Sequence, residues 1–186
     1  MSDSAPPFDT RQFRNTLGRF ASGVTIVTTR HEGQTHGMTA NAFVSVSLNP
    51  PLVLVSVDHR AAMHQFLPRT RRYGVSILGE HQQPLSNHFA GRTVAGLHIP
   101  FVERNGMPLI ADAVAYFVVE VIDAHVAGDH TLYIGRVEYF ESHDGRPLLF
   151  HAGRYQHVKP EAPRIQASPE DDFSLFSLGS LDPPIA

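Results

Sequence analysis

The sequence predicts a mainly β protein with flanking helices, folded as an antiparallel barrel. Several short segments are rich in β-branched residues, short glycine-containing turns separate them, and only two or three stretches have helical periodicity. Closing the sheet into a barrel removes the exposed edges that so many strands would otherwise leave. With 186 residues, 42% of them hydrophobic and 18% charged, a single globular domain is expected.

In the first half of the chain, we expect a helix, a hairpin and a buried strand. Asp9 can cap the helix, Phe13, Leu17 and Phe20 give it one apolar face, and Gly23 ends it. The strands are expected at 24–29 and 36–44, joined by a turn at 31–34, and at 52–57 after the break at Asn49-Pro50-Pro51. The run 52–57 is apolar on both faces, as is typical of a strand covered on both sides.

In the second half, a short helix at 60–67 is expected to stop at Pro68. Residues 91–108 contain little periodicity and are predicted to form a long loop, a kind of segment that is often functional. The remaining expected elements are a strand at 73–78, a helix at 83–90, and strands at 115–127, 131–140 and 148–155.

Composition change divides the chain into a domain, 1–159, and a tail, 160–186. The tail holds five of the 14 prolines and the acidic cluster Glu170-Asp171-Asp172. The formal charge of −3 favours neither nucleic acid nor an anionic membrane as a partner. The chain has no cysteine, no apolar run long enough to span a bilayer and no signal-like N-terminus, which agrees with a cytoplasmic protein.

The 12 histidines do not form a metal-binding pattern. There is no HExxH, no His-x-His, and no pair four residues apart on an expected helix, so no metal site is predicted. The sequence also lacks the GxSxG turn of serine hydrolases and the GxGxxG turn of dinucleotide-binding Rossmann domains.

The most informative segment is 37–55, where short polar side chains interrupt an apolar strand-turn-strand pattern. Thr39, Asn41, Ser45 and Ser47 alternate, so in an extended chain they would share one face. They could face water from a half-exposed strand, or form a wall that offers donors and acceptors to a planar polar ring or a phosphate. The pattern alone leaves both interpretations open.

Four motifs, in order, resemble the flavin reductase-like family, which includes the small reductase components of two-component flavin monooxygenases. The first is the 37–55 segment with its Pro-Pro pair. The others are FRNTLGRFASGVTIVT at 13–28, GDHTLYIGRV at 128–137 and PLLFHAGRY at 147–155. The resemblance covers about residues 10–158 and leaves the tail out.

The resemblance implies a split β-barrel that forms a homodimer and holds FMN or FAD in a groove near the dimer interface. NADH or NADPH would deliver hydride to the flavin, and the reduced flavin would leave for a separate oxygenase component. Two alternatives stay open: a flavoprotein of this fold that reduces a corrinoid, a ferric complex or a quinone, and a non-catalytic flavin-binding protein.

The resemblance also implies site residues. His130 would orient the nicotinamide or handle a proton; its alternative role is that of a turn residue. The family's Ser-x-Thr after the third strand is replaced by Arg60-Ala61-Ala62, so that Arg60 or backbone amides would meet the flavin phosphate. The other implied flavin contacts are Met38, Thr39, Ala40, Asn41, Ser45, Ser47, Ser56, Val57, Asp58, Phe89, Ala90 and Gly91, and those to the nicotinamide nucleotide are His151, Gly153, Arg154 and Tyr155.

Overall fold

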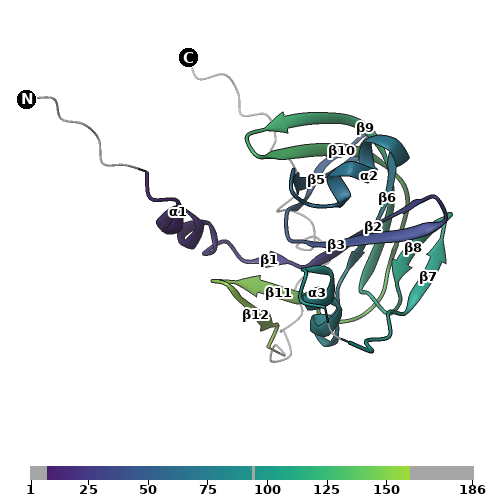
Figure 1. The fold of residues 1–186 in the computed structure, drawn as a ribbon. Helices are drawn as coiled ribbons and strands as arrows, with labels where there is room; N and C mark the ends of the chain where they lie inside the picture. Colours follow the sequence, from purple (N-terminus) through teal and green to yellow (C-terminus); the bar gives the residue numbers. More distant parts are fainter. Residues whose placement is uncertain (1–7, 94, 160–186) are drawn as a thin grey trace, which may run out of the picture.

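A seven-stranded antiparallel sheet forms the main body of the computed structural model, which describes residues 8–93 and 95–159 (Figure 1). The strand order is β3-β2-β6-β9-β10-β5-β4. The strands are β2 (Thr25–His31), β3 (Gln34–Ala40), β4 (Phe43–Leu48), β5 (Pro51–Asp58), β6 (Arg72–Ile77), β9 (Ala115–Ala127) and β10 (His130–Ser142).

Two smaller sheets and four helical segments complete the described chain. β1 (Ser22–Gly23), β11 (Leu148–His151) and β12 (Arg154–His157) form one small sheet, and β7 (Phe101–Arg104) pairs with β8 (Met107–Ile110) in the other. The helical segments are α1 (Thr10–Leu17), α2 (Met63–Thr70), the 3-10 turn η1 (Glu80–Gln82) and α3 (Gln83–Phe89). No helix in 8–93 or 95–159 is long and apolar enough to cross a bilayer.

The core lies on both sides of the curved sheet. Met63 and Leu67 of α2 pack on Val55, Val57 and other buried residues of the large sheet. A second cluster joins the β1-β11-β12 sheet and α3 to the other end of β2 and β6, through Val24, Ile26, Leu78, Leu85 and Leu148. These two clusters hold α2 and α3 at opposite ends of β3, on which the candidate site is built.

The mainly β, antiparallel fold class is confirmed. β3 and β4 stand at the two ends of the strand order, and among the described residues no pairing joins them. The sheet is therefore open along the seam between these strands, where Asn41 and Ala42 connect them.

Several predicted boundaries are wrong. The strand expected at 36–44 is broken at Asn41-Ala42, and the loop expected at 91–108 contains the hairpin strand β7. The strand expected at 148–155 is a hairpin, because Ala152 and Gly153 have φ angles of 49° and 77° and turn the chain. Local composition does not show these turns, since each depends on which neighbouring strand supplies hydrogen bonds.

The two predicted helices at 9–23 and 60–67 also differ from the structure. α1 ends at Leu17, so Phe20 lies beyond it. Pro68 lies inside α2 instead of stopping it, because the buried face formed by Met63 and Leu67 outweighs the backbone hydrogen bond that proline removes. The predicted tail, 160–186, lies outside the described residues.

Candidate active site

A groove of about 630 Å³ runs along the open seam of the sheet. Its wall is the free edge of β3 and the connection to β4, and its ends are formed by β5, α2, α3 and β10. The lining residues are Gly37, Met38, Thr39, Ala40, Asn41, Ala42, Ser56, Asp58, Arg60, Ala61, Ala62, Met63, Phe89, Ala90, Gly91 and His130.

The edge position of β3 determines what the groove offers a ligand. Among residues 8–93 and 95–159, β3 pairs only with β2, so the backbone N–H and C=O groups on its other side have no strand partner there. At one end of the groove lies the start of α2, whose N-cap residue Ala62 makes no side-chain hydrogen bond and whose first turn contains no acidic residue. The N–H groups of His64 and Gln65 already donate to the carbonyls of Ala61 and Ala62, which leaves the N–H of Met63 as the first-turn donor for an anion.

Asp58 and Arg60 form an ion pair at this end of the groove. The guanidinium group of Arg60 donates from Nη2 to Asp58 Oδ2 at 2.6 Å and from Nε to Oδ1 at 3.0 Å. Hydrogen bonds from the Arg60 side chain and backbone N–H hold the pKa of Asp58 well below its usual range. The carboxylate thus stays ionised at neutral pH and orients Arg60, whose side chain is 85% exposed.

His130 is the first residue of β10 and pairs with Asp58 on the neighbouring strand β5, so it lies at the same end of the groove as Asp58 and Arg60. Its Nδ1 is 2.7 Å from Asp129 Oδ1, and this hydrogen bond lowers the pKa of Asp129. Because an ionised carboxylate can only accept, Nδ1 must carry the proton. The neutral ring therefore has Nε2 as an acceptor, while the protonated ring can donate from it.

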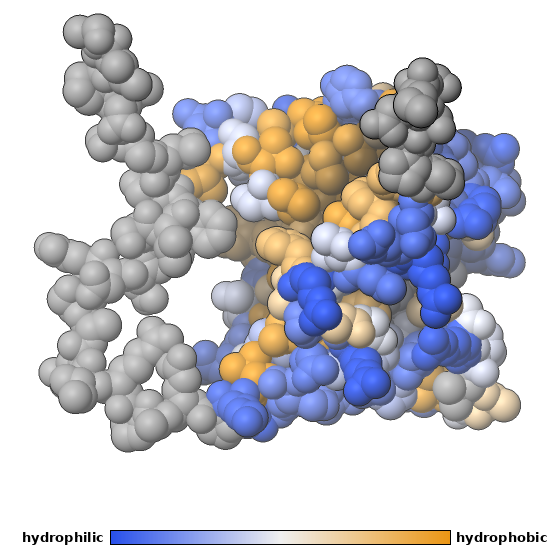
Figure 2. Space-filling view, turned by 90° about the vertical axis from the view of Figure 1, so that its left-hand side faces the viewer, coloured by the Kyte–Doolittle hydropathy of each residue, from blue (hydrophilic) through white to orange (hydrophobic). Residues whose placement is uncertain are grey.

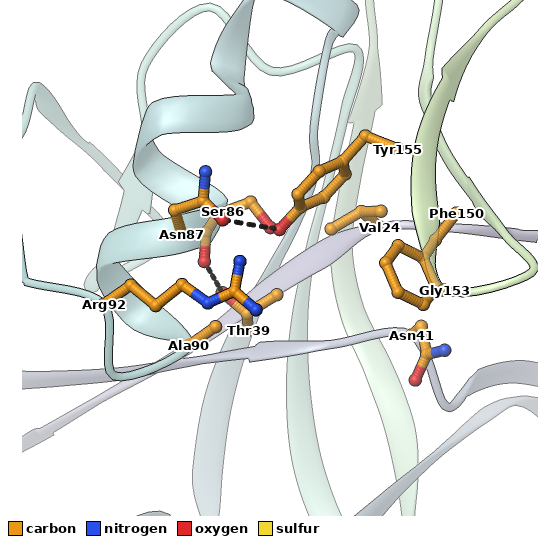
Figure 3. Close-up of a pocket in the computed structure, with 10 residues that line it drawn as sticks. All are labelled: Val24, Thr39, Asn41, Ser86, Asn87, Ala90, Arg92, Phe150, Gly153 and Tyr155. Carbon is orange, nitrogen blue, oxygen red and sulfur yellow. Dashed lines mark hydrogen bonds between the residues drawn. The ribbon is translucent and has the colours of Figure 1, made fainter. Parts of the chain in front are cut away.

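A second cavity of about 310 Å³ adjoins the groove and shares Thr39, Asn41 and Ala90 with it (Figure 3). α3 forms one side and the β11–β12 hairpin the other, and the Arg92 side chain extends across the cavity toward Thr39 (Figure 3). The remaining lining residues are Val24, Ser86, Asn87, Phe150, Gly153 and Tyr155.

Hydrogen bonds tie the walls of this second cavity together. Thr39 Oγ1 donates to the Ser86 carbonyl at 2.7 Å, which joins β3 to α3. The hydroxyls of Tyr155 and Ser86 lie 2.9 Å apart, and the Tyr155 hydroxyl donates to Asn87 Oδ1 at 3.3 Å. Since Ser86 is fully buried, α3 is held from both sides at one residue.

The structure brings most of the predicted site residues together. Eleven of them line the groove: Met38, Thr39, Ala40, Asn41, Ser56, Asp58, Arg60, Phe89, Ala90, Gly91 and His130. Gly153 and Tyr155 line the second cavity. Their contacts with flavin or nicotinamide stay predictions.

Five predicted residues are not among the lining residues of either cavity. Ser45 and Ser47 lie on β4, because the turn at Asn41-Ala42 and a bulge between the two serines interrupt the expected alternation. Val57 is fully buried in the core, since alternation along β5 places Ser56 and Asp58 on the opposite face. His151 and Arg154 lie on the β11–β12 hairpin outside the cavity lining.

Sequence reasoning missed several lining residues. Ser86, Asn87 and Arg92 carry polar groups into the second cavity, but they belong to no motif that we identified. These three residues adjoin the predicted Phe89-Ala90-Gly91 segment in the sequence, and this closeness could have indicated that they belong to the site. Gly37 and the first residues of α2 were also missed.

Comparison with known proteins decides the family. The model of the flavin reductase like domain matches residues 17–159 of this chain. The chain belongs to this family. It is 50% identical over 149 residues to an NADH-dependent flavin reductase of a Rhodococcus species, which covers 78% of this chain and 85% of that protein. It is 41% identical to the NADH-dependent flavin reductase StyB of Pseudomonas fluorescens, over 85% of this chain and 95% of StyB.

Solved structures of flavin reductases share the fold. Flavin reductase PheA2 in its native state matches with a TM-score of 0.80 and 45% identity, over 82% of this chain and all of that chain. The NADH:FAD oxidoreductase SgcE6 of Streptomyces globisporus, in complex with NAD and FAD fragments, matches with a TM-score of 0.79 and 37% identity, over 87% and 100% of the two chains. The predicted family, fold class and enzyme class, an oxidoreductase that reduces flavin, are confirmed.

Proposed function

We propose that this flavin reductase uses NADH to reduce FMN or FAD and that the reduced flavin leaves for a separate oxygenase. The observation that supports this proposal best is that two cavities adjoin each other. The groove has a free backbone edge, and the second cavity is lined by hydroxyl, amide and guanidinium groups. Relatives with this description include the reductase component of a 4-nitrophenol monooxygenase from Rhodococcus opacus, 35% identical over 83% of this chain.

The flavin is proposed to lie in the groove with its ring along β3. Unpaired backbone groups of this edge and the Asn41 side chain suit the polar side of a flavin ring, while Met38, Ala40 and Phe89 suit its apolar side. The phosphate would lie at the other end, where Arg60 and the uncapped first turn of α2 converge. The groove volume of about 630 Å³ is within the usual range for such ligands.

The nicotinamide nucleotide is proposed to enter between His130 and the second cavity. Hydride transfer from nicotinamide to flavin is chemistry that the two cofactors supply when bound. The protein would hold the two rings in contact, and the free backbone N–H groups of β3 would stabilise negative charge on the flavin ring. His130 would orient the nicotinamide through Nε2, and Arg92 and Tyr155 would bind the remainder of the nucleotide.

A homodimer is proposed because α1 meets only the β11–β12 hairpin, at its C-terminal end, within the described residues. It stands apart from the body (Figure 1), and none of its residues is buried in residues 8–93 and 95–159. Leu17 is 58% exposed and Phe20, just beyond the helix, 83% exposed. Figure 2 shows apolar surface gathered on this side of the molecule. Exposed apolar area of this kind is typical of an interface between subunits.

We also propose that the dimer is located in the cytoplasm, where NADH is available.

The decisive experiment is steady-state NADH oxidation with and without added FMN or FAD. A reductase that releases its product needs added flavin for turnover, and the rate should saturate with flavin concentration. Turnover without added flavin, using a tightly held cofactor and a corrinoid, ferric complex or quinone as acceptor, would favour the first alternative. Flavin binding without NADH oxidation would favour a storage protein.

A further inference from the structure

Gly37 occupies the middle of β3, where glycine lowers the stability of the strand and the backbone conformation does not require it. Its φ angle is not in the left-handed region that favours glycine. In a strand interior, glycine gives up side-chain packing and loses more conformational entropy on folding than other residues do. A close approach of another group to the strand explains glycine at such a position.

The group that approaches Gly37 is the ring of Phe89. A Cβ atom built on Gly37 would lie 2.6 Å from Phe89 Cε1 and 2.9 Å from Cδ1, well inside van der Waals contact. The ring thus rests directly on the backbone of β3. Both residues line the groove, and the partly buried Phe89 also packs against the second core cluster.

α3 cannot easily move away to relieve such a contact. Three residues before Phe89, the fully buried Ser86 is bonded to Thr39 on β3 and to Tyr155 on β12. A side chain at position 37 would therefore displace the ring of Phe89 and not the helix. The open space beside this ring is the groove.

We propose that Gly37 is a positioning residue that acts through Phe89. Because Gly37 has no side chain, the Phe89 ring packs directly on the backbone of β3. In this position the ring forms the α3 side of the groove and sets the width of the groove for a planar ring ligand. This inference rests on the proposed binding of flavin in the groove.

The test is a double-mutant cycle with Gly37→Ala and Phe89→Ala, measured as quenching of FMN fluorescence on binding. In the wild-type background, Gly37→Ala should weaken FMN binding by about 5-fold to 100-fold, the effect of overpacking a fitted contact. In the Phe89→Ala background, the same change should cost less than about 2-fold, because the ring is gone. Gly23→Ala is the control, since a Cβ there meets nothing within 4 Å.

Unchanged FMN affinity in Gly37→Ala, or an equal loss in both backgrounds, would overturn the inference. If Gly37→Ala does not fold, a cooperative thermal melt restored in the double variant supports the contact, and failure of both variants to fold overturns it. Wild-type protein that binds no FMN would instead contradict the proposed function itself, so the two failures are distinguishable.

Discussion

At the scale of single residues, the candidate site depends on charged and polar side chains whose orientation is set by a neighbour. Asp58 holds Arg60, and Asp129 holds the Nδ1 of His130. In both pairs the carboxylate pKa is lowered by the hydrogen bonds it accepts. Both carboxylates therefore stay ionised at neutral pH, and they lose these partners only in acid, as the pH falls through the lowered pKa values.

Replacing His130 tests its proposed contact with the nicotinamide. His130→Ala should leave FMN affinity nearly intact and lower kcat/KM for NADH by about 10-fold to 1,000-fold, since only transition-state positioning is lost. His125→Ala is a matched control, because His125 is also an exposed histidine paired with an aspartate, Asp123, at 2.8 Å. Stopped-flow flavin reduction and a thermal melt measure the two effects. Normal reduction with a lower melting temperature would show that His130 is a structural turn residue.

Arg60 and Arg92 should affect different ligands. Arg60→Ala should weaken FMN binding by about 2-fold to 10-fold and leave riboflavin, which has no phosphate, unchanged, as expected for one exposed charge-assisted contact. Arg92→Ala should instead raise KM for NADH, because Arg92 lines the second cavity. Titrations with FMN and riboflavin and NADH kinetics measure both. Equal losses for FMN and riboflavin would remove Arg60 from the phosphate site.

At the scale of secondary-structure elements, α3 is the part that connects the two cavities. Thr39 joins it to β3, and the Ser86–Tyr155 hydrogen bond joins it to the β11–β12 hairpin. The residues that follow the hydrogen-bonded part of α3, Phe89 to Gly91, line the groove. A change in the hairpin can therefore reach both cavities through one helix.

The hydroxyl of Tyr155 provides a test of this connection. Tyr155→Phe removes the contacts with Ser86 and Asn87, so unfolding free energy should fall by about 0.5–1.5 kcal/mol and KM for NADH should rise by roughly 2-fold to 10-fold. Denaturant melts and steady-state kinetics measure these changes. Tyr139→Phe is the control, since its hydroxyl contacts Glu141 on β10 and it lines neither cavity. The same rise in KM for both variants would argue against a specific role of the hairpin.

At the scale of the whole molecule, the sheet is open at the seam that carries the site, and α1 extends beyond the body (Figure 1). Both features leave unpaired backbone and apolar surface within the described monomer. A second subunit would cover such surfaces and provide a second wall for a planar cofactor.

Light scattering tests this assembly directly. The wild-type protein should have twice the 20.5 kDa mass of the chain. Leu17→Asp and Phe20→Asp should shift the measured mass toward that of the monomer, because buried unpaired charges oppose association. The rate of flavin reduction should fall with the loss of the dimer. Phe101→Asp, on β7 at the opposite side of the molecule (Figure 1), is the control. A wild-type monomer with full reductase activity would contradict the proposed dimer.

Much of this protein was predictable from sequence because its signals are local. β-branched runs and turn residues predicted most strands, and the ordered motifs around Asn41, His130 and Tyr155 predicted the family. The capping of α1 by Asp9 was also predictable, since the side chain accepts hydrogen bonds from N–H groups two and three residues away. In each case the residues that make the contact lie close together in the chain.

What only the tertiary structure decided depends on residues far apart in the sequence. The alternation from Thr39 to Ser47 predicted one continuous wall, but the pairing of β4 with β5 takes Ser45 and Ser47 away from the groove. Two further features likewise require α3 to pack on β3. Arg92 lines the second cavity, and Phe89 contacts Gly37. The sequence by itself determined the strands, the family and the chemistry that it implies, because periodicity and motifs are local. The tertiary structure decided which side chains share a cavity, because that depends on long-range strand pairing and helix packing.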